Sequence, residues 1–140
     1  MSSDINNWGS LPYLERLMQF AGARNSLLND SIANLDTPGY TPKDVSAVEF
    51  QQAMREALAE EESGKPGARF RDTQNIRFES DAVSLQPIET EENILFHDGN
   101  DRSLERLMQG LSENFLAFRY AAELFRNTHE TLNSAIRLRP

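Results

Sequence analysis

The residue types in this chain that could carry out chemistry are carboxylates and two histidines. Adjacent acidic side chains occur at residues 60–62 and 89–92, and the histidines are His97 and His129. Neighbouring carboxylates could act in acid–base catalysis or bind a metal ion, but acid–base catalysis needs groups held in a fixed geometry. Both acidic runs are expected to be flexible, and two histidines are too few for a metal site on their own.

No catalytic motif accompanies these side chains. The chain has no cysteine, which excludes thiol catalysis, disulfides and thiolate metal sites. It also lacks a glycine-rich phosphate loop, an H-E-x-x-H metal motif and a G-x-S-x-G nucleophile motif. We therefore expect a protein that is not an enzyme and that needs no cofactor and no metal.

Length and charge narrow the possible partners. The chain has 140 residues, which is enough for one domain, and a net charge of -8. This acidity argues against nucleic acid as the main partner, because nucleic acid requires clustered lysine and arginine. No apolar run approaches ~18 residues, so no membrane span is expected. The first ten residues are polar, so export, if it occurs, is expected without a cleaved signal peptide.

The dominant element of the sequence is a long helix predicted over residues 101–138. Its apolar residues alternate at spacings of four and three, which is typical of a helix with a narrow seam for a partner helix. The predicted seam consists of Leu104, Met108, Leu111, Phe115, Phe118, Ala122, Phe125, His129, Leu132 and Ile136. At a rise of ~1.5 Å per residue this helix would be about 55 Å long, so the seam needs a partner helix from this chain or from another.

A second helix of the same kind is predicted near the N-terminus. Ser10 and Pro12 suit its start, and it is expected to run to about Asp36. Its seam consists of Leu14, Met18, Ala21, Asn25, Leu28, Ile32 and Leu35. Each seam contains one polar residue, Asn25 or His129, and such a residue costs stability but fixes the register of paired helices. The alternative for either helix is an ordinary amphipathic helix packed on a core.

The N-terminal helix is followed by a strong turn signal. Thr37 precedes a proline and is therefore pushed out of helical geometry. Pro38 and Gly39 fit the two central positions of a type II turn, where glycine supplies the positive φ.

The middle of the chain contains a third, shorter helix. Ser46 and Glu49 form a capping box, and Val45 and Phe50 flank it as a hydrophobic staple. This helix is expected to end in the acidic run that closes at Gly64. Residues 65–100 are expected to be irregular and partly extended, with short extended pieces at 68–71 and 76–78. The chain thus divides into residues 1–40, 41–100 and 101–140.

The turn and the end of the first helix resemble a known family signature. Residues 28–40 are similar to the N-terminal motif of the axial proteins of the bacterial flagellum, the rod, hook and hook-associated group. The matching residues are Ile32, Ala33, Asn34, Asp36, Thr37, Pro38, Gly39 and Tyr40. Asp30 and Ser31 stand where the family usually has asparagines. Residues 98–100 and 113–120 resemble its C-terminal region, and the small size resembles the proximal, B-type rod members, with the neighbouring C-type as the alternative.

This resemblance carries specific expectations. It implies a mainly α fold, an elongated antiparallel helical hairpin or coiled coil of the N- and C-terminal helices. It implies a structural subunit of the proximal rod that polymerises through these helices and serves motility. Expected partners are further copies, other rod proteins, the basal adaptor, the membrane ring and the flagellar type III export machine. The location would be the basal body rod, which crosses the periplasm. The alternative is a soluble dimeric binding module such as a secretion chaperone or adaptor.

Overall fold

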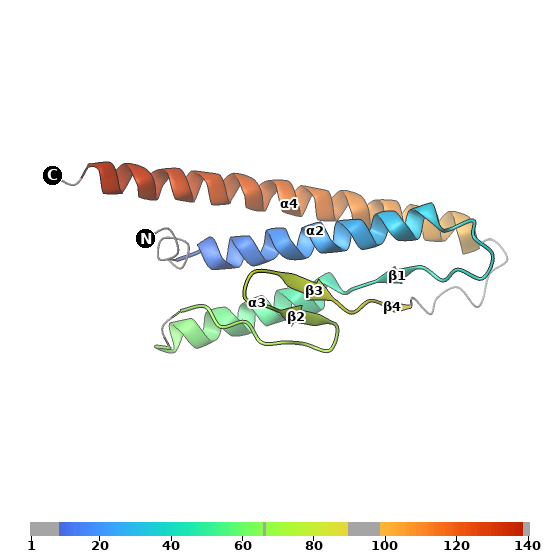
Figure 1. Ribbon diagram of the computed structural model, residues 1–140, viewed down its shortest axis with the longest axis horizontal. Helices are drawn as coiled ribbons and strands as arrows, with labels where there is room; N and C mark the ends of the chain where they lie inside the picture. The colour runs from blue at the N-terminus through green and yellow to red at the C-terminus, as the bar shows by residue number, and fades with distance from the viewer. Residues whose placement is uncertain (1–8, 66, 90–98, 139–140) are drawn as a thin grey trace.

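The computed structural model describes residues 9–65, 67–89 and 99–138 (Figure 1). Its helices are α2 (Leu11–Ala33), α3 (Ala47–Glu62) and α4 (Gly99–Arg137). Its strands are β1 (Lys43–Asp44), β2 (Ile76–Phe78), β3 (Val83–Leu85) and β4 (Ile88–Glu89). Acidic residues 91 and 92 and His97, considered above as chemical groups, lie outside the described residues.

The molecule is elongated and built in layers. Helix α4 lies along α2 and runs in the opposite direction, while α3 and the strands lie on the other side of α2 (Figure 1). Helix α4 has 39 residues and α2 has 23, so α4 extends past the start of α2. The prediction of a mainly helical protein with packed N- and C-terminal helices is confirmed.

Helix α2 begins as predicted and ends slightly early. Proline occupies its first turn, and Ser10 is the N-cap residue, although its side chain makes no capping hydrogen bond. The helix ends at Ala33 rather than near Asp36. The backbone N–H and the side-chain amide of Asn34 both donate to the carbonyl of Asp30, at 3.1 and 2.8 Å. These bonds satisfy a terminal carbonyl and close the last turn of the helix.

Helix α3 begins at the predicted cap, but the capping box is only half formed. The hydroxyl of Ser46 accepts a hydrogen bond from the backbone N–H of Glu49 at 3.4 Å. The carboxylate of Glu49 turns instead to the loop before β2, where it accepts hydrogen bonds from the Thr73 hydroxyl and from the backbone and side chain of Asn75. Burial disfavours the charged carboxylate, but these hydrogen bonds outweigh it and hold the pKa of Glu49 below its ordinary value.

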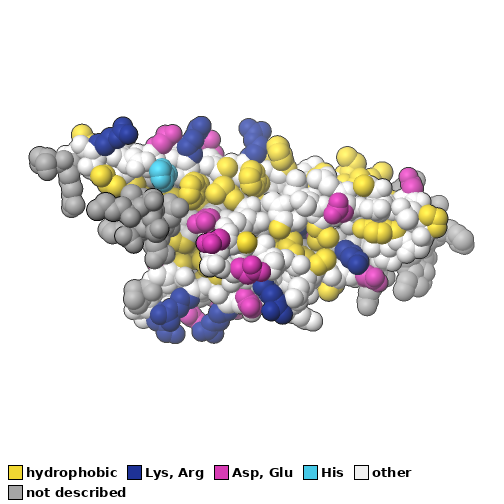
Figure 2. Space-filling model, in the orientation of Figure 1, with side chains coloured by type: hydrophobic (Ala, Val, Ile, Leu, Met, Phe, Trp, Pro, Cys, Tyr) yellow, Lys and Arg dark blue, Asp and Glu magenta, His cyan; other side chains and the backbone are white. Residues whose placement is uncertain are grey.

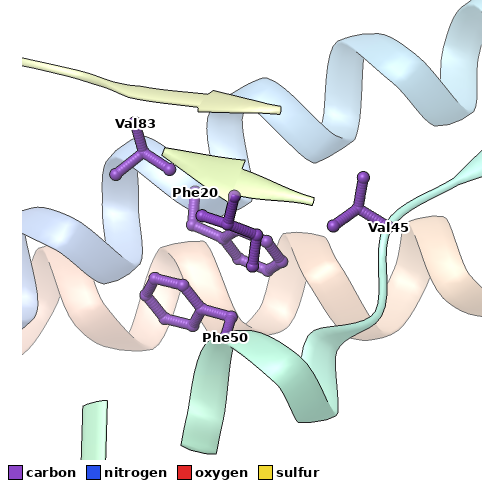
Figure 3. Packing of buried hydrophobic residues seen from close by; sticks show 5 residues of the cluster. Phe20, Val45, Phe50 and Val83 are labelled. Carbon is purple, nitrogen blue, oxygen red and sulfur yellow. The ribbon is translucent and has the colours of Figure 1, made fainter. Parts of the chain in front are cut away.

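The core lies between α2 and the layer of α3 and the strands. Its buried cluster consists of Phe20, Val45, Phe50, Ile76 and Val83 (Figure 3). The rings of Phe20 and Phe50 stack with their centroids 4.2 Å apart. The two residues of the predicted staple, Val45 and Phe50, thus meet in this cluster and fix the angle at which the chain enters α3.

The strands form two short antiparallel pairs. Strand β2 pairs with β3, with Ile76 opposite Leu85, and it coincides with the extended piece predicted at 76–78. Strand β1 pairs with β4, with Lys43 opposite Glu89. Two-stranded pairs of this length are not stable alone. The β2–β3 pair is held because Ile76 and Val83 are buried in the cluster with Phe20 of α2. Residues 68–71, also predicted to be extended, form no strand.

Candidate assembly surface

The contact between α2 and α4 is close and contains a buried polar side chain. Ala21 and Ala121 are almost fully buried, and their small side chains allow the two helices to approach each other. The side-chain amide of the buried Asn114 of α4 donates to the backbone carbonyl of Ala21 of α2 at 2.6 Å. The buried Oδ1 atom of Asn25, one turn further along α2, has no hydrogen-bond partner in the described part of the chain.

The predicted seam of α2 largely faces this contact. Ala21 and Leu28 are buried, and Leu28 lies beside Gly110 of α4. The remaining predicted residues are half-buried: Leu14, Met18, Asn25, Ile32 and Leu35.

The buried face of α4 is rotated relative to its predicted seam. The buried residues are Leu107, Asn114 and Ala121, and each precedes a predicted seam residue by one position. Half-buried seam residues are Leu111, Ala122, Phe125, His129 and Leu132, and exposed ones are Leu104, Met108, Phe115, Phe118 and Ile136. Part of the predicted seam therefore points away from α2, where no described part of the chain covers it.

We call Leu104, Met108, Phe115 and Phe118 the α4 stripe. Their side chains are 37%, 53%, 52% and 39% exposed, in chain order. Figure 2 shows hydrophobic side chains gathered along α4 and its boundary with α2. The guanidinium of Arg119 lies 6.0 Å from the centre of the Phe115 ring, so a cation borders the stripe. A row of exposed large apolar side chains on one helix is a candidate interaction site.

The turn after α2 has the predicted geometry. The N–H of Tyr40 donates to the carbonyl of Thr37 at 3.1 Å, which closes a four-residue turn around Pro38 and Gly39. Gly39 has a φ of 77°, as a glycine at the third position of a type II turn requires. The tip of the turn, residues 36–39, is exposed, as is Ala33, whereas Ile32, Asn34 and Tyr40 are half-buried.

A buried hydroxyl holds the chain that leaves this turn. The side chain of Ser31 is fully buried and donates to the carbonyl of Lys43 at 3.1 Å. It accepts hydrogen bonds from the N–H of Lys43 at 3.2 Å and from the hydroxyl of Tyr40 at 3.3 Å. Sequence reasoning missed Ser31 because its partners lie nine and twelve residues away, beyond any local pattern.

An ion pair strengthens the same connection. The guanidinium of Arg24 forms two parallel hydrogen bonds, at 2.9 and 2.8 Å, with the carboxylate of Asp44. Bidentate, partly buried pairs of this kind are geometrically specific. The turn motif therefore leads the chain back along α2 and sets the position from which α3 begins.

Gly39→Val is expected to lower the free energy of unfolding by about 1–2 kcal/mol, because a β-branched residue strains the left-handed conformation. A Cβ at Gly39 would meet no atom within 4 Å, so the cost is one of backbone conformation alone. Chemical denaturation of the full chain measures it. Gly39→Asn is the matched control, since asparagine tolerates positive φ, and equal losses in the two variants would contradict this explanation.

The sequence suggested that the acidic run at residues 60–62 is flexible. In the structure this run forms the last turn of α3. Its members have structural partners: Glu60 forms an ion pair with Arg71, and Glu61 accepts a hydrogen bond from the Tyr13 hydroxyl at 2.6 Å. Burial and this hydrogen bond raise the pKa of Tyr13 well above its usual value. Among the residues that the structure describes, no group of three potential metal ligands is found, and no helix is long and apolar enough to cross a membrane.

An elongated antiparallel helix pair with an exposed apolar stripe is typical of proteins that assemble through helices. No family model and no solved structure matches the chain. It is 23% identical over 128 residues to the flagellar basal body rod protein FlgB of Bacillus subtilis (strain 168), a match that covers 91% of this chain and 93% of that protein. The resemblance to FlgB-type rod proteins suggested by the turn motif is thus confirmed over nearly the whole length.

Proposed function

We propose that this chain is a structural subunit of the flagellar basal body rod, of the proximal B-type, and that it polymerises through its terminal helices. The exposed α4 stripe carries this proposal, because a polymer would bury it between subunits. The similarity to a rod protein along 91% of the chain supports the flagellar setting. The similarity does not favour a secretion chaperone or adaptor, and a rod subunit has no catalytic role.

The form of the contact follows from the geometry of the stripe. The stripe lies on one helix and is not repeated on the side of α3 and the strands, where the exposed large apolar residues of the described chain are Val48, Leu58 and Ile88. Contact between two different surfaces generates a closed ring if the rotation closes and an open helical polymer if it does not. A rod wall built this way would use the α4 stripe as one of its two surfaces.

The remaining partners and the location belong to the same proposal. The subunit would contact other rod proteins, with the basal adaptor and the membrane ring at the base. It would reach the rod across the periplasm through the flagellar type III export machine, without cleavage.

The test is Phe115→Asp, introduced into the bacterium that encodes this chain in place of the natural gene. We expect the amount of the chain in purified basal bodies to fall about tenfold or more, because a buried, unpaired charge at an interface costs about 2 kcal/mol or more. Motility is expected to fall with it. Export should continue, because Phe115 is 52% exposed in the free subunit and the fold tolerates the change.

The matched control is Leu116→Asp. Leu116 is the adjacent residue, is 64% exposed, and lies away from the stripe on α4. This variant should enter basal bodies at close to the normal level. Normal incorporation of the Phe115 variant, or equal loss of both variants, would show that the stripe is not the assembly surface. A normally motile strain without the gene would refute the rod role itself.

A further inference from the structure

We propose that two free copies of this chain pair through their α4 helices in antiparallel orientation, so that the stripe of each copy is covered by apolar residues along α4 of the other. This self-pairing goes beyond the rod role and does not depend on it. The residues on the two sides of the stripe determine which helix can pack against it and in which orientation.

One flank of the stripe is already occupied. Leu107 and Asn114 lie one position before the stripe residues Met108 and Phe115, and Ala121 follows Asn114 by seven residues. All three are buried on the side of α4 that faces α2. The other flank faces solvent. It consists of Glu105, Ser112, Arg119 and Arg126, which are spaced by seven residues and are all exposed. In paired helices the residues that flank the seam determine partner and orientation.

In an antiparallel pair, the solvent-facing flank of one helix meets the same flank of the other. When Glu105 lies opposite Arg126 of the second copy, Ser112 lies opposite its Arg119. Because the arrangement is symmetric, the Glu105–Arg126 contact forms twice, and no like charges meet along this flank. Such charge complementarity selects a register and a partner.

The same register gives well-matched apolar layers. Phe115 of each copy lies beside Phe118 of the other, which places the two largest stripe residues at the centre. Toward the ends, Met108 faces Phe125, and Leu111 faces the small Ala122. A parallel pair would instead place Glu105 and Arg126 against the flank packed on α2, where the buried residues offer them no charge.

Nothing in the described part of the chain obstructs this contact. Helix α3 and the strands lie on the far side of α2 from α4 (Figure 1). Arg126 forms an ion pair with Glu123 at 2.8 Å, but both side chains are exposed, at 64% and 57%. An exposed pair of this kind contributes little, so Arg126 can turn to a second copy.

Sedimentation equilibrium of the full-length purified chain, with Glu105→Arg, Arg126→Glu and the double exchange, tests the pairing. The natural chain should form a dimer at micromolar concentrations. Each single exchange creates two like-charge contacts and should raise the dissociation constant about tenfold or more, since like charges that meet across an interface repel each other and destabilise the pair. The double exchange restores opposite charges and should return the constant to within about threefold of the natural value.

Glu113→Arg is the matched control, because Glu113 is exposed on α4 but lies on the side opposite the stripe. It makes the same charge change and should leave the dimer intact. If circular dichroism shows that the double exchange does not fold, Glu105→Gln is compared with Glu113→Gln instead. Only Glu105→Gln should then weaken the dimer.

A natural chain that stays monomeric to high micromolar concentration would overturn the pairing. Single exchanges that leave the dimer unchanged, or a folded double exchange that does not restore it, would overturn the antiparallel register. These outcomes concern the purified chain and say nothing of the rod role, which is measured by incorporation into basal bodies. Either proposal can therefore fail alone.

Discussion

Asn114→Asp is expected to lower the free energy of unfolding by about 3 kcal/mol or more at neutral pH. The side-chain amide of Asn114 is buried and donates to the carbonyl of Ala21 at 2.6 Å. An aspartate has almost the same shape, but its ionised carboxylate would face that carbonyl oxygen with no donor between them. The variant must either bury an unpaired charge or separate α4 from α2.

The loss should depend on pH in a defined direction. Burial against a carbonyl raises the pKa of the new carboxyl in the folded state above its unfolded value of about 3.9. Below the unfolded pKa the carboxyl is protonated in both states, and the electrostatic penalty is absent. As pH rises from there to the folded pKa, the penalty grows by about 1.4 kcal/mol per unit and then levels off.

Urea denaturation of the full chain at several pH values measures this loss. Asn127→Asp is the matched control, because Asn127 lies on the same helix but is exposed. It should change stability by about 0.5 kcal/mol at most, with little dependence on pH. Equal stability of the two variants at neutral pH would show that Asn114 does not join the two helices in solution.

The long helices could be predicted because their signal is local and repeated. The four-three spacing of α2 and α4 extends over many turns, and the turn between α2 and β1 is set by Pro38 and Gly39 themselves. Helix α3 was found in the same way, from the staple of Val45 and Phe50. In each case the residues that determine the element lie within a few positions of one another.

The four-three spacing could not predict which face of α4 turns toward α2. Leu107, Asn114 and Ala121 are spaced by seven residues, as are Met108, Phe115 and Ala122. Hydrophobicity favours the second set as the inner face. Close approach of two helices instead favours small side chains and a hydrogen bond across the contact, and α4 therefore turns Ala121 and Asn114 toward α2. The sequence identified an apolar seam, while the structure shows which half of it the described chain leaves exposed.

Hydrogen bonds between residues far apart in the sequence explain the other features that the sequence did not predict. The carboxylate of Glu49 was expected to complete its own capping box, but it accepts more hydrogen bonds from Thr73 and Asn75 than the box would offer. The link from Ser31 to Lys43 arises in the same way. The strands are two or three residues long, which is too short for an alternating pattern to appear in the sequence.

Phe50→Ala should cost about 3–5 kcal/mol, because it removes a large buried side chain and leaves a cavity. Phe50 is 2% exposed and stacks on Phe20 of α2 with the ring planes 10° apart. Its ring also lies 6.1 Å from that of Phe78 in β2. One side chain thus joins α3, α2 and the strand pair, and thermal or urea unfolding should show the full loss. Val48→Ala, at an exposed position in the first turn of α3, should change stability by about 0.5 kcal/mol at most.

The effect of Phe50→Ala should also be unequal across the molecule. The cluster around Phe50 holds α3 and the strands to α2, whereas the contact of α2 with α4 is made by other residues, centred on Ala21 and Asn114. Hydrogen exchange followed by mass spectrometry should therefore show faster exchange in α3 than in the middle of α4. Equal acceleration in both helices would mean that the layers unfold as one cooperative unit. In that case the α4 stripe would depend on the core beneath α2, and a core substitution would impair assembly without touching the surface that makes the contact.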